Sequence, residues 1–181
     1  ASLVAAAARP PRAPKGAQPA RPSPDRDARW GRKGRRSVFG YKLHIAVDQA
    51  QTLIRRVAVT HAAVTDTEPA DALVCGDEQA VYGDQAYYTH ARHARLKAAG
   101  IKDRLMRRPN KHHPELPERH KRRNRLIGRV RAAVERPFAV FKVHYGLRRM
   151  RFFNQASNTV HVILACCAYN LGRAANIRAA A

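Results

Sequence analysis

The sequence predicts an α/β fold in which a mixed β-sheet is flanked by helices. Apolar side chains alternate with smaller or polar ones, the period of a β-strand, at Phe39, Tyr41, Leu43, Ile45 and Val47. Downstream, short strand-like and helix-like segments follow one another, an order typical of α/β proteins. Apolar residues make up 45% of the 181 residues, which is enough to build one domain with a substantial core.

Local patterns place the individual elements. Expected strands cover residues 39–47, 53–60, 79–83 and 101–106. Because only a short turn at residues 48–51 separates the first two strands, we expect them to form an antiparallel hairpin. Expected helices cover residues 67–73 and 90–99. Gly100 follows the second of these helices, and glycine often ends a helix because it accepts a left-handed backbone.

The C-terminal part of the chain shows the strongest helical pattern. Its apolar residues recur at steps of three and four, at Leu126, Val130, Val134, Phe138, Phe141 and Tyr145. Pro137 lacks a backbone N–H, so we expect a kink there. A final helix is expected to begin at Ser157 or Asn158 as its cap. One apolar side of that helix comprises Val160, Ile163, Leu164, Cys167 and Leu171.

The chain divides into three expected segments. Residues 1–36 contain repeated prolines and scattered basic residues, so we expect an extended basic arm that starts with the end of a truncated strand. Residues 37–175 are expected to form the folded domain, and residues 176–181 a short tail. Within the domain, residues 107–124 are crowded with Arg, Lys, His and Pro and are expected to form a basic loop.

The charge of the chain indicates a polyanionic partner. There are 35 Lys and Arg residues against 13 Asp and Glu, which gives a formal net charge of +22. Nucleic acid is the leading candidate, because each neutralised phosphate adds affinity; a ribosomal or membrane-surface protein is the alternative. The basic run from residue 121 to 125 offers phosphate contacts through Lys121, Arg122, Arg123 and Arg125. The longest apolar run is too short to span a bilayer, so no membrane partner is expected.

Two carboxylates are candidates for metal chemistry. Asp84 stands at the end of an expected strand, where ligands gather in open α/β sheets. Glu135 lies in the long helix, where the spacing puts Arg131, Glu135 and Lys142 on one stripe. A carboxylate among cations stays ionised and is ready to hold a divalent metal ion. The alternative is structural: Glu135 in a surface ion pair and Asp84 in a turn.

The motifs that contain these carboxylates resemble a known family. Gly83-Asp84-Gln85-Ala86-Tyr87 resembles the segment around the second acidic residue of the DDE transposases of bacterial insertion sequences. The spacing Arg131-x3-Glu135-x6-Lys142 is similar to the signature around their third acidic residue. Residues 39–44, 145–149 and 169–171 also resemble that family, and the resemblance covers roughly residues 1–175.

The resemblance implies an RNase H-like fold and a three-carboxylate site that holds two Mg²⁺ or Mn²⁺ ions. Asp84 and Glu135 would be catalytic metal ligands, while Arg131 and Lys142 would contact DNA or orient Glu135. The first acidic residue of the family would fall immediately before residue 1. Asp48 is a possible stand-in, although it fits the hairpin turn better. We therefore expect the 181-residue chain alone to be inactive.

The resemblance also implies partners and a setting. Double-stranded DNA, at the ends of an insertion sequence and at its target, is the expected partner. We expect a homo-oligomer on DNA, a cytoplasmic, nucleoid-associated location and no small-molecule cofactor. Two other functions stay open: a non-catalytic DNA-binding remnant and a basic RNA-binding protein.

Overall fold

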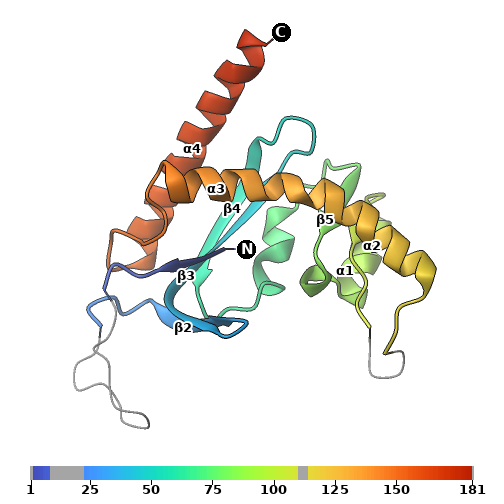
Figure 1. Ribbon diagram of the computed structural model, residues 1–181, viewed down its shortest axis with the longest axis horizontal. Helices are drawn as coiled ribbons and strands as arrows, with labels where there is room; N and C mark the ends of the chain where they lie inside the picture. Colours follow the sequence, from blue (N-terminus) through green and yellow to red (C-terminus); the bar gives the residue numbers. More distant parts are fainter. Residues whose placement is uncertain (1, 9–22, 110–113, 181) are drawn as a thin grey trace.

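The computed structural model describes residues 2–8, 23–109 and 114–180 (Figure 1). Strands and helices alternate along much of the chain, so the expected α/β class is confirmed. None of the helices in these residues is both long enough and apolar enough to cross a membrane.

The larger sheet is built around one long central strand. Its strands are β1 (Ser2–Ala5), β2 (Arg29–Lys33), β3 (Arg36–Val47) and β4 (Ile54–His61). All three neighbours pair with β3 in antiparallel register. The β3–β4 hairpin and its turn were both expected. In the turn, the Asp48 carboxylate accepts a hydrogen bond from the backbone N–H of Gln51 at 2.6 Å, so Asp48 serves the turn.

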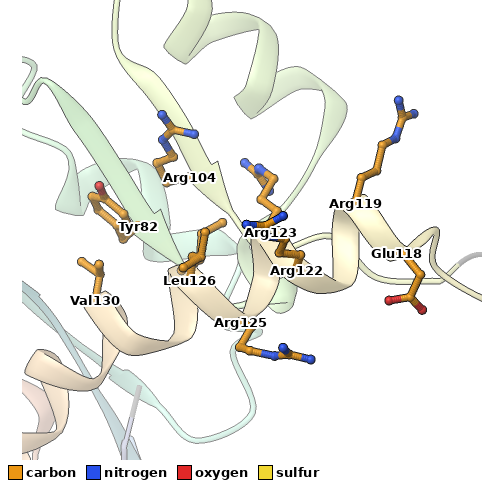
Figure 2. A pocket seen from close by; sticks show the side chains of 10 residues that line it. Tyr82, Arg104, Glu118, Arg119, Arg122, Arg123, Arg125, Leu126 and Val130 are labelled. Carbon is orange, nitrogen blue, oxygen red and sulfur yellow. The ribbon is translucent and has the colours of Figure 1, made fainter.

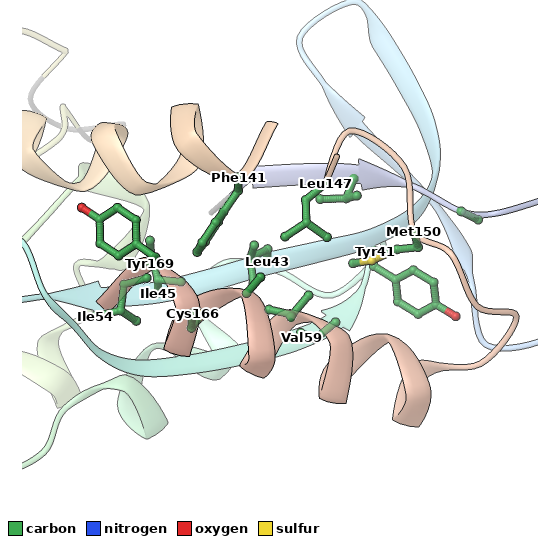
Figure 3. Packing of buried hydrophobic residues seen from close by; sticks show 14 of the residues in the cluster. Tyr41, Leu43, Ile45, Ile54, Val59, Phe141, Leu147, Met150, Cys166 and Tyr169 are labelled. Atoms are coloured by element: carbon green, nitrogen blue, oxygen red, sulfur yellow. The ribbon is translucent and has the colours of Figure 1, made fainter. Parts of the chain in front are cut away.

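The main core lies between this sheet and two helices, α3 (Glu135–Val143) and α4 (Gln155–Ala179) (Figure 3). The alternation read from the sequence sends Tyr41 and Leu43 of β3 into this core, where both are fully buried. Phe141 of α3 meets them from the helical side and is also fully buried. Each such large apolar side chain stabilises the fold by roughly 1.5–3 kcal/mol relative to its exposed state.

A second, smaller sheet carries the candidate site. Strands β5 (Ala80–Gly83) and β6 (Lys102–Leu105) are parallel, and α1 (His90–Ala98) connects them. Leu96, Ile101 and Leu105 form their small core. One mixed sheet was expected, but no ladder joins the two sheets in the described residues. At Ala5, the edge of β1 that faces away from β3 bonds instead to the backbone of Arg148 and Met150.

The expected long helix is interrupted. It consists of α2 (Glu118–Arg131), a 3₁₀ turn η3 (Ala132–Val134) and α3, which Figure 1 shows as one bent rod across the molecule. Pro137 follows the turn and cannot donate to the carbonyl four residues earlier, which accounts for the break. Two details differ from expectation. Helix α2 starts inside the expected loop of residues 107–124, and it buries Ile127 while Leu126 is exposed.

The face of helix α4 that is buried is not the face that the apolar pattern predicted. Val160, Ile163, Leu164 and Leu171 are exposed, and the buried side comprises Asn158, Val162, Ala165, Cys166 and Tyr169. The N-cap is Asn154, whose side chain accepts from the N–H of Ser157. The helix continues to Ala179, through most of the expected tail.

The expected basic arm contains folded parts at both ends. Residues 2–5 form β1, as the strand-like start suggested. Toward the other end, Asp25 is buried and accepts a 2.6 Å hydrogen bond from the Tyr41 hydroxyl. Strand β2 follows within the same expected arm. The fold therefore begins upstream of residue 37, because Asp25 anchors this segment to β3; residues 9–22 of the expected arm lie outside the described residues.

Candidate active site

Asp84 lies where the sequence places it, directly after β5. It caps the short 3₁₀ helix η2 (Gln85–Tyr87), because one carboxylate oxygen, Oδ1, accepts from the N–H of Ala86 at 2.7 Å. Gly83 comes just before it, and an added Cβ there would lie within 2.6 Å of a Leu105 methyl group, so a larger residue would displace that buried side chain. The local turn thus uses one carboxylate oxygen of Asp84 and leaves the other for a ligand.

The loop that carries Asp84 is held from behind by contacts that the sequence did not reveal. The Thr67 hydroxyl donates to the carbonyl of Ala86 at 2.8 Å. Arg92, which is buried, donates to the carbonyls of Thr67 and Tyr87 and to Asp71. The hydrogen bond from Arg92 is the main reason that the pKa of Asp71 lies below its ordinary value. Arg92 therefore ties the Asp84 loop to η1 (Glu68–Leu73) through a planar fork whose donors are shared among three partners.

Glu135 opens α3 and is exposed, with 67% of its side chain accessible. Arg131 Nη2 donates to Glu135 Oε1 at 3.1 Å, which is the neighbour relation that their spacing predicted. Lys142, two turns further along α3, is half-buried and has no ion-pair partner among the described residues. One carboxylate oxygen of Glu135 and the whole ammonium group of Lys142 are thus available for other partners.

The hydroxyl of Tyr87 lies within electrostatic range of both motifs. The pKa of Tyr87 is raised to about 12, mainly by burial and to a lesser degree by the charges of Asp66 and Asp84, while the charge of Arg131 opposes the shift. Strand β5, which leads into Asp84, packs against α2, which ends at Arg131, so the two motifs lie on neighbouring elements. In the described part of the chain, however, no group of three potential metal ligands within 4.8 Å of one another includes Asp84 or Glu135.

Asp66 is a nearby carboxylate that the sequence reading passed over. It forms a 2.9 Å ion pair with Lys42, and the hydrogen bond between Thr67 and Ala86 joins its segment to the Asp84 loop. Burial by itself would raise the pKa of Asp66, but the hydrogen bond and charge of Lys42, together with the charge of His44, act in the opposite direction, and the pKa lies below its ordinary value. The signal was present in the sequence: Lys42 belongs to the family-like stretch of residues 39–44.

The four basic residues of the run from 121 to 125 differ in what they can contact. Arg123 donates to the backbone carbonyls of Leu105 and Asp103 at 2.7 and 2.8 Å, so its role is structural. Lys121 pairs with Glu118 at 2.8 Å on the surface. Arg122 and Arg125 are exposed and are the two best placed to meet phosphates.

One other cluster resembles a metal site, but its carboxylate oxygens already accept hydrogen bonds from protein groups. Cys75, Asp77 and Glu78 bring a thiol and two carboxylates within 4.8 Å of one another. Both carboxylate oxygens of Asp77 accept from Arg55, and those of Glu78 accept from the backbone N–H groups of Cys75 and Gly76. The loop is therefore held by protein donors, and it contains none of the expected site residues.

Comparison with known proteins agrees with the motifs. The family described as Transposase DDE domain matches residues 12–171. A curated relative from Neisseria meningitidis serogroup B, the "Transposase for insertion sequence element IS1106", is 29% identical over 157 residues. That alignment covers 86% of this chain and 54% of the relative, so the chain spans about half the relative's length. No solved structure matches the chain. Because the family covers most of its length, the chain belongs to the DDE transposases of insertion sequences.

Proposed function

We propose that this domain acts in the metal-dependent cleavage and strand transfer of insertion-sequence DNA. The observation that carries the proposal is that two family-type carboxylates, Asp84 and Glu135, follow elements that pack against each other: Asp84 comes directly after β5, and Glu135 comes shortly after α2. Each carboxylate has one oxygen free of the protein contacts described above. An RNase H-like arrangement of the two sheets is part of the same proposal.

The donor chemistry of these residues fits Mg²⁺ or Mn²⁺, because both ions prefer hard carboxylate oxygens. Asp84 would present its free oxygen from a loop fixed by Thr67 and Arg92, and Glu135 would present its own from the start of α3. When bound, a pair of such ions activates an attacking oxygen and stabilises the leaving oxygen of a phosphodiester. Two carboxylates of this chain would contribute to that site, and a third would complete it.

The cations nearby have separate tasks in this proposal. Arg131 orients Glu135 through its 3.1 Å hydrogen bond. Lys142 lies on α3, the helix that carries Glu135, and has no ion-pair partner in the described residues. Its ammonium group would therefore meet a phosphate of duplex DNA. A homo-oligomer assembled on DNA belongs to the same expectation.

The proposal is tested by measuring Mn²⁺ binding to the 181-residue chain by calorimetry. Asp84→Asn and Glu135→Gln should each weaken binding about tenfold or more, because each removes a ligand. Asp77→Asn is the matched control, since Asp77 is an exposed carboxylate in the separate cluster with Cys75 and Glu78. If only the control weakens binding, the ion lies at that cluster and the proposed site is wrong.

A second assay addresses catalysis. We expect the 181-residue chain to bind DNA without nicking it in Mg²⁺, since only two of the three family carboxylates have counterparts here. Nicking by the purified chain would contradict this expectation. The non-catalytic DNA-binding function is favoured if DNA binding persists while Mn²⁺ binding is absent. Tighter binding of structured RNA than of duplex DNA at equal salt would favour an RNA-binding function.

A further inference from the structure

A hollow lies beside the candidate site, between α2 and the small sheet (Figure 2). Its volume is about 820 Å³, within the range of ~300–1,000 Å³ typical of pockets that hold small ligands. Tyr82 lies at one end, two residues before Asp84, and Val130 faces it just before Arg131. The hollow therefore lies next to the ends of β5 and α2, which lead toward the proposed metal ligands Asp84 and Glu135.

The rim of this hollow is cationic and unpaired. Four exposed arginines line it: Arg104, Arg119, Arg122 and Arg125. None of them has an ion-pair partner in the described residues, and Glu118, the acidic residue of the lining, is paired with Lys121. Exposed guanidinium groups without carboxylate partners are suited to phosphates, which accept two parallel N–H donors.

The floor of the hollow is apolar, which a surface for duplex phosphates alone does not need. Leu126 is 55% exposed and points into the hollow, and Tyr82 and Val130 continue the floor (Figure 2). The buried Ile127 also belongs to the lining. In a duplex the base faces are stacked inside and only phosphates, sugars and base edges face a protein. An apolar and aromatic floor between arginines instead matches unpaired nucleotides, whose exposed base faces pack on such side chains.

The walls of the hollow are fixed in advance. Arg123 ties α2 to β6 through its bonds to Leu105 and Asp103, and Asn124 bonds to both the N–H and the carbonyl of Arg107, at 2.9 and 2.7 Å. These contacts use the inner face of α2 and leave Arg122 and Arg125 on the outer rim. A preformed wall lowers the entropy cost of binding a flexible strand.

We propose that this hollow binds unpaired DNA, a single-stranded or frayed segment adjoining the site of cleavage. The bases pack on Tyr82 and Leu126, and the phosphates meet the arginine rim. The inference rests on the proposed function, because it assigns a substrate form to the same site. It adds that the domain distinguishes strands with exposed bases from closed duplex.

The test compares the binding of an oligothymidine strand with that of a blunt duplex of equal length by fluorescence anisotropy. Leu126→Ser should weaken oligothymidine binding about tenfold and leave duplex binding unchanged, because it removes base contact and keeps every charge. Leu171→Ser is the matched control, since Leu171 is 72% exposed on α4 and lies outside the hollow. Tyr82→Phe should retain the base contact, and Tyr82→Ala should lose it.

The charge contribution is separated by salt titration. Arg122→Gln and Arg125→Gln should each reduce the slope of log affinity against log salt for oligothymidine by about 0.7, as expected for one phosphate contact to a single strand. Arg178→Gln, at the exposed end of α4, is the control and should change neither slope nor affinity.

The outcomes separate the inference from the proposed function. If duplex binding is retained and Leu126→Ser behaves like Leu171→Ser with oligothymidine, the inference is wrong while DNA binding stands. If neither form of DNA binds the wild-type chain, the proposed function itself fails. Tighter binding of oligouridine than of oligothymidine, with the same loss in Leu126→Ser, would replace DNA by RNA as the occupant and overturn the inference.

Discussion

At the residue scale, His44 is a buried histidine whose surroundings disfavour its charged form. It lies on β3 with no accessible surface, and its Nε2 is 3.0 Å from the Thr60 hydroxyl. Burial is the main cause that lowers the pKa of His44 to about 4; the Lys42 charge adds to the effect and Asp66 opposes it. The fold therefore holds a neutral imidazole over a pH range in which the unfolded chain already binds a proton there.

This difference predicts a stability loss on acidification. As pH falls from about 6.5 toward 4, the unfolded state takes up a proton at His44 and the native state does not, so stability falls by about 3 kcal/mol over that window. His44→Gln keeps a polar partner for Thr60 and should flatten this part of the pH profile, measured by urea unfolding at each pH. His144→Gln, at an exposed position, is the control and should show the same dependence of unfolding free energy on pH as the wild type. Equal slopes in wild type and His44→Gln would contradict the account.

At the element scale, sequence patterns located strands and helices better than they assigned helix faces. The alternation of β3 and the motif around Asp84 were sufficient to place both elements. In α4, by contrast, apolar residues occur on both sides, and Val160 and Val162 are equally apolar. What decides the face is the tertiary contact of Tyr169 with Phe141 and the bonding of Asn158 to Phe152, and neither contact is visible in local periodicity.

The same limit applies to the site. Arg92 and Thr67 hold the Asp84 loop through backbone carbonyls 5 to 25 residues away, and such bonds leave no pattern of side-chain types. The pairing of Arg131 with Glu135 was predictable because one turn of helix fixes their distance. The folded stretch from Asp25 to β2 was missed because its proline-rich neighbourhood resembles an extended arm.

The choice of face in α4 can be measured with a matched pair of valines. Val162 is fully buried and Val160 is 58% exposed on the same helix. Val162→Ala should lower the free energy of unfolding by about 2 kcal/mol, because it removes buried methyl groups and leaves a cavity. Val160→Ala should change it by less than about 0.5 kcal/mol. Denaturant unfolding of both variants shows which face of α4 is buried. A larger loss of unfolding free energy in Val160→Ala than in Val162→Ala would mean that the helix buries the opposite face.

At the scale of the whole molecule, the dominant property is charge. The formal net charge of +22 means that repulsion among cations opposes folding. The described ion pairs at Arg55, Lys121 and Arg131 have largely exposed carboxylate partners, and exposed pairs contribute only ~0–1 kcal/mol each. They cannot offset the excess of basic residues, so the isolated domain should be least stable at low ionic strength.

Salt should therefore have opposite effects on the free and the DNA-bound chain. Raising salt from ~0.1 to ~1 M shortens the screening length from about 10 to 3 Å, which relieves repulsion and should raise the melting temperature of the free protein. DNA at about 100 times its dissociation constant stabilises the folded state by ~2.7 kcal/mol, and that gain should disappear at high salt because affinity falls with each released counterion. Thermal melts with and without duplex DNA should converge as salt rises. If the increase in melting temperature caused by DNA stays the same at all salt concentrations, the charge of this chain is not what binds DNA.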